Sequence, residues 1–191
     1  MYVLGGILSI LMLTAGCAKP PAWNGLDVSG VLPDLNFTLL NSDGEQVNAK
    51  SFRGKTTLLY FGFTHCPVVC PTTLGQISVA LAELGELAAD VQVLLVSVDP
   101  ERDTPQAMKD YTARFGPWLH GLTGSESALR TLNQSYKVDF MAQGTDPDGQ
   151  YDVVHSNRIF AFDSGGACRL LLADISDTAA IVSDLQRLVE E

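Results

Sequence analysis

The chain has few basic side chains. Of its 191 residues, 12 are Lys or Arg and 22 are Asp or Glu, which gives a formal net charge of −10. Nucleic-acid binding depends on Lys and Arg that neutralise phosphates, so this composition argues against a nucleic-acid partner. The acidic surface suits a soluble domain and favours a cationic partner.

The first 16 residues lack any charged side chain, and residues 3–13 are nearly all apolar. This run is shorter than the about 20 residues of a transmembrane helix, and it fits the apolar core and cleavage region of an export signal. Residues 13–17, Leu-Thr-Ala-Gly-Cys, resemble a bacterial lipoprotein box in which Cys17 receives the lipid. We therefore expect a lipoprotein signal peptide over 1–16, a lipid-anchored tether over 17–31 and a domain over 32–191, on the periplasmic side of a membrane. The alternative is an uncleaved N-terminal anchor.

Cysteine and histidine are scarce, with four and three residues. When Cys17 is assigned to the lipid, the cysteines that remain are an odd number: Cys66, Cys70 and Cys168. An odd number outside the cytoplasm argues against a simple disulfide framework. We expect Cys168, at the start of a predicted strand, to be a buried inert thiol.

The order of the predicted elements indicates an α/β domain. Continuous apolar runs at 56–63 and 91–98 predict two central strands that are buried on both faces. The other expected elements are a hairpin at 37–47, a short strand at 118–122, a polar loop at 142–151, a hairpin of strands 158–163 and 168–172, and helices at 72–89, 105–115, 125–136 and 176–191. This order predicts a thioredoxin-like fold with an N-terminal β-hairpin extension and an inserted loop before the C-terminal β-hairpin.

Two cysteines, Cys66 and Cys70, lie where the first buried strand gives way to a helix. The N-terminus of a helix stabilises a thiolate, which is the form that attacks disulfides and binds soft metals. Pro71 fits the first turn of this helix, where its missing N–H costs nothing. The cysteine pair is therefore able either to close a disulfide or to place both sulfurs on one metal ion.

Two thiolates alone rarely hold a metal, so we expect a third ligand among the histidines. His65 is expected to point away from the shared face, and His120 to lie at a partly exposed edge. His155 is the favoured ligand, because its loop lies opposite the cysteine turn in a thioredoxin-like arrangement; the alternative is a local hydrogen bond at the base of the hairpin. Two Cys and one His suit Cu(I), and Cu(II) with an added ligand, whereas structural zinc normally takes four ligands.

Asp99 ends the second central strand, beside the cysteine turn. Ligands gather at the carboxyl ends of strands in open α/β sheets. We expect Asp99 either to support the metal ligands or to help dock a partner, and the alternative is that it caps the turn that follows at Pro100.

Three ordered motifs resemble the Sco/SenC family of copper chaperones. They are residues 60–74, Tyr-Phe-Gly-Phe-Thr-His-Cys-Pro-Val-Val-Cys-Pro-Thr-Thr-Leu, residues 96–105, Val-Ser-Val-Asp-Pro-Glu-Arg-Asp-Thr-Pro, and Val154-His155-Ser156. The resemblance implies a thioredoxin-like, membrane-anchored domain that faces the periplasm or the intermembrane space. It implies copper bound by Cys66, Cys70 and His155, and a role in building the dinuclear copper centre of cytochrome c oxidase.

The partners that this resemblance implies are the copper-bearing subunit of cytochrome c oxidase and other periplasmic copper chaperones or thioredoxin-like reductases. A thiol–disulfide oxidoreductase that reduces the cysteines of a copper-site client is the alternative function. A peroxidase is disfavoured, because no Pro-x-x-x-Thr-x-x-Cys pattern leads to Cys66.

Overall fold

The computed structural model describes residues 22–138 and 157–191, together with two strands at 140–145 and 151–155. The strands are β1 (Leu26–Asp27), β2 (Thr38–Asn41), β3 (Gln46–Asn48), β4 (Thr56–Gly62), β5 (Val91–Ser97), β6 (Leu119–Thr123), β7 (Phe140–Thr145), β8 (Tyr151–His155), β9 (Ile159–Phe162) and β10 (Cys168–Leu172). The helices are α1 (Val69–Leu84), α2 (Pro105–Thr112), α3 (Glu126–Ser135) and α4 (Thr178–Glu190), with 3-10 turns η1 (Ala49–Phe52) and η2 (Gly85–Asp90).

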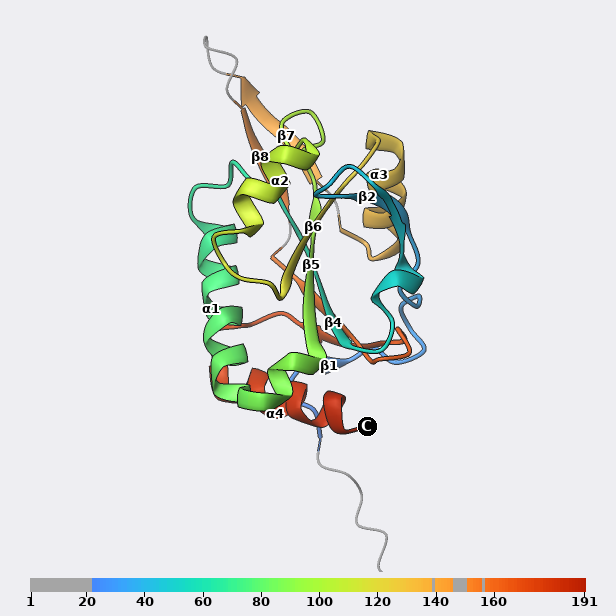
Figure 1. Ribbon diagram of the computed structural model, residues 1–191, viewed down its shortest axis with the longest axis vertical. Coiled ribbons are helices and arrows are strands. Elements are labelled where there is room, and N and C mark those ends of the chain that lie inside the picture. Colours follow the sequence, from blue (N-terminus) through green and yellow to red (C-terminus); the bar gives the residue numbers. More distant parts are fainter. Residues whose placement is uncertain (1–21, 139, 146–150, 156) are drawn as a thin grey trace, which may run out of the picture.

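An eight-stranded mixed sheet forms the centre of the domain, in the order β1-β10-β9-β4-β5-β6-β2-β3. The two long strands β4 and β5 run parallel, and every residue in both is buried, as their continuous apolar runs predict. Helix α1 and helix α3 lie on opposite sides of this sheet (Figure 1). The predicted α/β class is confirmed, because helices cover a sheet whose central strands are parallel.

Helix α1 follows β4 and is shorter than the sequence pattern indicates. It begins at Val69 and ends at Leu84, and the chain then continues as η2. The cause is Gly85, whose φ of 66° is in the left-handed region that ends many helices. Pro71 lies in the first turn, as expected, where no intrahelical partner for an N–H exists.

The prediction of a polar loop at 142–151 is wrong in part, because residues 142–145 and 151 belong to strands. Strands β7 and β8 pair antiparallel in a separate two-stranded sheet, and residues 146–150 lie outside the described part of the chain. Phe, Tyr, Val and Thr in these strands favour extended backbone, whereas the Asp-Pro-Asp-Gly sequence between them favours a turn. The prediction of a loop rests on this Asp-Pro-Asp-Gly sequence alone.

The expected position of His120 at an edge is also wrong. Its strand β6 lies inside the sheet, parallel to β5 on one side and antiparallel to β2 on the other. The His120 ring packs edge-on against Phe52, with ring centroids 5.7 Å apart. Burial lowers the pKa of His120, and the Lys55 charge lowers it further.

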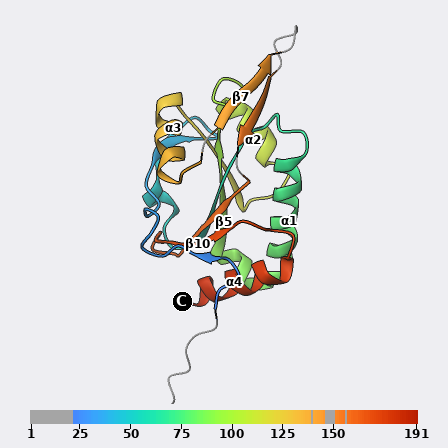
Figure 2. The ribbon, with the colours of Figure 1, turned by 180° about the vertical axis from the view of Figure 1, so that it is seen from behind.

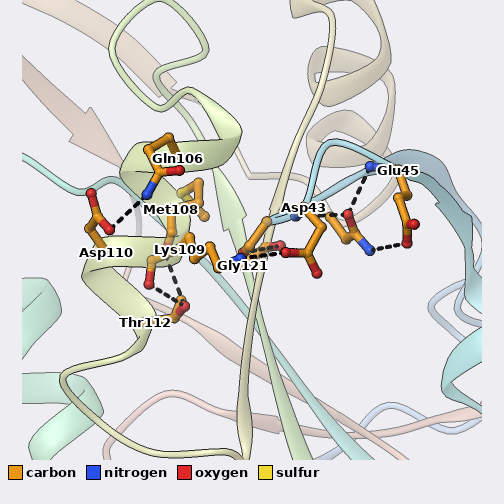
Figure 3. Close-up of polar contacts among 10 residues, drawn as sticks. Asp43, Glu45, Gln106, Met108, Lys109, Asp110, Thr112 and Gly121 are labelled. Atoms are coloured by element: carbon orange, nitrogen blue, oxygen red, sulfur yellow. Dashed lines mark hydrogen bonds and ion pairs between the residues drawn. The ribbon is translucent and has the colours of Figure 1, made fainter.

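The predicted N-terminal hairpin is confirmed as β2 and β3, and side chains tie its turn to helix α2. Asp43 in the turn accepts an ion-paired hydrogen bond from Lys109 Nζ at 2.7 Å (Figure 3). The Ser42 hydroxyl next to it donates to the Gly121 carbonyl of β6 at 3.2 Å. These contacts join the hairpin to α2 and to β6, the strand next to β5 in the sheet.

Residues of the expected tether pack on the domain. The buried carboxylate of Asp184 in α4 accepts hydrogen bonds from the backbone N–H groups of Asn24 and Gly25 at 3.0 and 2.7 Å. The Trp23 ring lies against the guanidinium groups of Arg169 and Arg187. Strand β1, at 26–27, then pairs with β10. The predicted signal peptide and Cys17 lie outside the described residues.

The two ends of the domain differ in what they carry. The start of α1 and the β7–β8 hairpin lie at one end, and α4 and the entering N-terminal chain lie at the other (Figures 1 and 2). Among the helices that the structure describes, none combines the length and the apolar character needed to cross a membrane.

Candidate metal centre

The cysteine turn, residues 63–68, connects β4 to α1. It begins after Gly62, where a Cβ atom would lie 3.0 Å from Cys70 Sγ and 3.0 Å from a methyl group of Leu95. A glycine at this position therefore lets the strand pass close to the sulfur. The turn continues with a backbone hydrogen bond from Cys66 N to the Phe63 carbonyl at 3.3 Å.

The two cysteines lie together at the N-terminus of α1, and both are reduced. Cys66 Sγ accepts a hydrogen bond from the backbone N–H of Cys70 at 3.2 Å. Val68, at the cap position, gives α1 no side-chain cap, so the Cys66 sulfur satisfies one of the free N–H groups of the first turn. Cys70 is fully buried, and Cys66 is 9% exposed. Cys66 is therefore the less completely buried residue of the pair.

Burial raises the pKa of the Cys70 thiol to about 12, although hydrogen bonds from Tyr60 and from the backbone of Phe63 oppose the rise. Desolvation at this buried position opposes the stabilisation of a thiolate that a helix N-terminus provides. The Tyr60 hydroxyl donates to Cys70 Sγ at 3.5 Å. Burial also raises the pKa of Tyr60, so this hydroxyl keeps its proton and remains a donor.

Asp99 is buried at the end of β5, where its carboxylate forms an ion pair with Arg102. Its backbone N–H donates to the Ser97 hydroxyl at 2.9 Å. The Arg102 guanidinium lies 5.8 Å from the centroid of the Phe63 ring, at the start of the cysteine turn. Arg102 thus links the Asp99 carboxylate to the turn, and the expected part of Asp99 in docking or ligand support stays a prediction.

Asp103 contacts the cysteine turn directly and was missed by the sequence reasoning. It is fully buried, and its carboxylate accepts from the Thr64 N–H at 3.1 Å, from the Thr64 hydroxyl at 2.6 Å and from the Ser97 hydroxyl at 2.7 Å. Burial raises the pKa of Asp103, and the hydrogen bonds from Thr64 and Ser97 oppose that rise. The available signal was a second aspartate in the segment after a buried strand.

The three histidines occupy different places. His65 is exposed on the cysteine turn, and its Nδ1 lies 3.0 Å from the Thr64 hydroxyl. His120 lies in β6, inside the sheet. His155 is the last residue of β8, and its backbone pairs with Phe140 at the base of the hairpin. Its role as a metal ligand stays a prediction.

Cys168 is buried at the start of β10, and its thiol is free. Burial raises its pKa to about 12, and the nearby Asp34 charge raises it further. These properties agree with the expectation of an inert buried thiol. Within residues 22–138 and 157–191, no three His, Cys, Asp or Glu side chains converge as a set that would hold a metal ion.

Comparison with known proteins gives the family. Residues 32–190 match the family model described as SCO1/SenC. A relative in Arabidopsis thaliana, "Protein SCO1 homolog 1, mitochondrial", is 43% identical over 121 residues, which are 63% of this chain and 36% of that protein. A SCO2-like protein from Rickettsia conorii is 35% identical over 132 residues, 69% of this chain and 64% of that protein. The chain thus spans less than two thirds of the length of either curated relative.

Solved structures show the same fold. The structure of Bradyrhizobium japonicum ScoI with copper bound has a TM-score of 0.74 and 37% identity, and the match covers 81% of this chain and 98% of that one. The crystal structure of a SCO1/SenC family lipoprotein from Bacillus anthracis has a TM-score of 0.70 and 25% identity, over 87% of this chain and 99% of that one. The family model spans residues 32–190, which include the cysteine turn, and the chain therefore belongs to the SCO1/SenC family.

Proposed function

We propose that this protein binds one copper ion through Cys66, Cys70 and His155, and that it delivers copper to, or prepares, the dinuclear copper centre of cytochrome c oxidase. Membership of the SCO1/SenC family supports this function, as does the relative from Bradyrhizobium japonicum whose structure contains copper. The copper-bearing subunit of the oxidase is then the client. The ion is cargo, so the site has to release it as well as bind it.

The three-ligand site is supported by a contact between the segment just after His155 and α1, the helix that contains Cys70. The side chain of Asn157 accepts a hydrogen bond at 3.0 Å from the hydroxyl of Thr73, which is one helical turn after Cys70. Two residues span at most about 7 Å, so the His155 Cα lies within that distance of the Asn157 Cα. The hydrogen bond of Asn157 to α1 therefore supports a ligand role for His155, two positions before it.

The chemistry of this ligand set fits a soft ion. Two thiolates and one imidazole suit Cu(I), and Cu(II) with a further ligand. Because the pKa of Cys70 is about 12 without metal, its thiol holds a proton at neutral pH, and copper binding releases that proton. The Tyr60 hydroxyl donates to this sulfur and limits the charge that the thiolate carries into the buried site.

A titration of the reduced protein with Cu(I), in competition with a chromophoric chelator, tests the proposal. We expect one copper per chain and an affinity at least about tenfold weaker for His155→Ala, because an imidazole ligand is lost. His65→Ala is the matched control, since His65 is exposed on the same turn, and it should bind copper as the parent does. Equal copper affinity of His155→Ala and the parent would contradict the three-ligand site.

Thiol–disulfide exchange is the second candidate function. It is favoured by the closeness of the two cysteines, since the Cys66 sulfur lies 3.2 Å from the Cys70 backbone nitrogen, and Cys66 is the less completely buried of the two residues. A reductase needs both cysteines and does not need His155. If this function operates, we expect the His155→Ala protein to reduce an oxidised copper-site peptide as fast as the parent does. If the parent protein reduces that peptide no faster than glutathione alone does, the reductase function is excluded.

We also propose that lipid at Cys17 holds the domain on the periplasmic side of a membrane. The apolar segment 1–16 and the small residues before Cys17 support this, and the Bacillus anthracis relative is a lipoprotein. On this proposal Cys17→Ser moves the protein from the membrane to the soluble fraction of cells. A protein that stays with the membrane after that substitution has another anchor.

A further inference from the structure

The contact between Thr73 and Asn157 joins two segments that are 84 residues apart in the chain. Thr73 lies in α1 and is 1% exposed, so its hydroxyl needs a partner inside the protein. Its Oγ1 donates to Asn157 Oδ1 at 3.0 Å. Asn157 is an exposed residue between β8 and β9, two positions after His155.

The same threonine is also close to the cysteine pair. It follows Cys70 by three residues, so both side chains lie on one face of α1. The Thr73 hydroxyl is one of the nearby groups that influence the pKa of Tyr60, which burial raises. Tyr60 in turn donates to Cys70 Sγ. Polar contacts thus lead from the segment that carries His155 to the sulfur of Cys70.

The strand after Asn157 is fixed independently. Ile159, the first residue of β9, is the register partner of Tyr60 in β4, and both side chains are fully buried. Among the described residues between this fixed point and the base of the β7–β8 hairpin, Asn157 has a side chain that reaches α1. Without the Thr73 contact, the chain from His155 to β9 would lose this attachment and gain conformational freedom.

We propose that Thr73 and Asn157 form a latch that positions His155 against Cys66 and Cys70, and that the latch sets the copper affinity without taking part in thiol chemistry. The inference depends on the proposed copper site. Neither latch residue is a ligand, and each acts through the histidine. Its loss leaves both thiols in place and lowers the fraction of time that the imidazole is within reach of the metal.

The test measures Cu(I) affinity of the reduced protein, by chelator competition, for Thr73→Val and Asn157→Ala, alone and combined with His155→Ala. We expect each single variant to bind copper about tenfold more weakly than the parent, as is typical when the support of a metal-binding histidine is removed. In the His155→Ala background, neither latch substitution should weaken binding further. Asn157→Asp keeps an acceptor oxygen for the Thr73 hydroxyl, so it should bind copper like the parent.

Two controls separate the latch from general effects on the fold. Thr131→Val removes an exposed hydroxyl of the same type from α3, where it donates to the Ser127 carbonyl, and should leave copper affinity unchanged. In a fixed glutathione buffer, the ratio of disulfide to dithiol at Cys66–Cys70 should be the same for Asn157→Ala and the parent.

The outcomes are distinct. If His155→Ala binds copper as tightly as the parent, the proposed copper site fails. If His155→Ala is weakened and Asn157→Ala is not, the latch is overturned while the copper site stands. Equal weakening by Asn157→Ala with and without His155 also overturns the latch, because it then shows a general structural effect.

Discussion

At the residue scale, Asp103 contributes more directly to the cysteine turn than Asp99 does, although both follow strand β5. Asp103 holds Thr64, two residues before Cys66, through hydrogen bonds to its backbone N–H and its hydroxyl. Asp99 instead pairs with Arg102. The position of Cys66 therefore depends on a fully buried carboxylate that is outside the proposed set of metal ligands.

Replacing Asp103 should weaken both the fold and the site. Asp103→Asn replaces a buried carboxylate that accepts three hydrogen bonds with an amide that keeps one acceptor oxygen, so we expect the free energy of unfolding to fall by about 2 kcal/mol. We expect the Cu(I) affinity to fall about tenfold, because the turn that carries Cys66 is less well held. Urea unfolding and chelator competition measure the two effects.

The comparison variant is Asp99→Asn, which leaves the hydrogen bonds to Thr64 intact. Its effect on copper affinity should be the smaller of the two. Unchanged copper affinity in a folded Asp103→Asn protein would show that Asp103 does not position the turn.

The thiol pair of this turn could be predicted from the sequence, whereas the hydrogen bonds that hold the turn and the start of α1 could not. Cys66, Cys70 and Pro71 are close together in the chain, so their spacing alone predicts a thiol pair at a helix N-terminus. The partners of Thr64 and Thr73 are 39 and 84 residues away. Which distant polar group meets a given hydroxyl depends on strand order and register, which local patterns do not contain.

At the element scale, apolar runs predicted the strands that matter most. Strands β4 and β5 are long, apolar and buried on both faces, so their type and position followed from composition. The position of β6 inside the sheet could not be predicted from composition. Its short Trp-Leu-His-Gly sequence does not indicate that β2 pairs with it on the side away from β5. His120 is therefore covered on both sides by neighbouring strands of the sheet.

Because of this placement, His120 makes the free energy of unfolding depend on pH. Burial lowers its pKa in the fold below the ordinary value of 6.5, so between the two values the unfolded chain binds more protons than the native protein. Its contribution to stability is therefore present above about pH 6.5 and is lost as the pH falls below that value. Replacement by an uncharged side chain removes the contribution.

Urea unfolding at pH 8 and at pH 5.5 tests this expectation. The parent should lose more stability between these two pH values than His120→Gln does. The difference between the two proteins isolates His120 from the other two histidines, because both proteins contain them. An identical loss in the two proteins would mean that His120 is protonated equally well in the folded and the unfolded chain.

At the scale of the whole molecule, the proposed copper site combines two segments that the sheet brings together. The cysteines follow β4, whereas His155 ends β8 and precedes β9, the antiparallel neighbour of β4. The entering chain is held at the other end of the domain, where Asp184 accepts from the backbone N–H groups of Asn24 and Gly25 (Figures 1 and 2). With the proposed anchor at Cys17, the cysteine turn then faces away from the membrane and toward a client.

The central claim is that copper is held by two sulfurs and one imidazole nitrogen in this arrangement. X-ray absorption at the copper K-edge of the Cu(I)-loaded protein, compared with His155→Ala, tests it most directly, because sulfur and nitrogen neighbours scatter differently. The account predicts two sulfur neighbours and one nitrogen neighbour in the parent, and loss of the nitrogen in the variant with both sulfurs retained. A site with three sulfur neighbours, or a nitrogen neighbour that persists in His155→Ala, would contradict it.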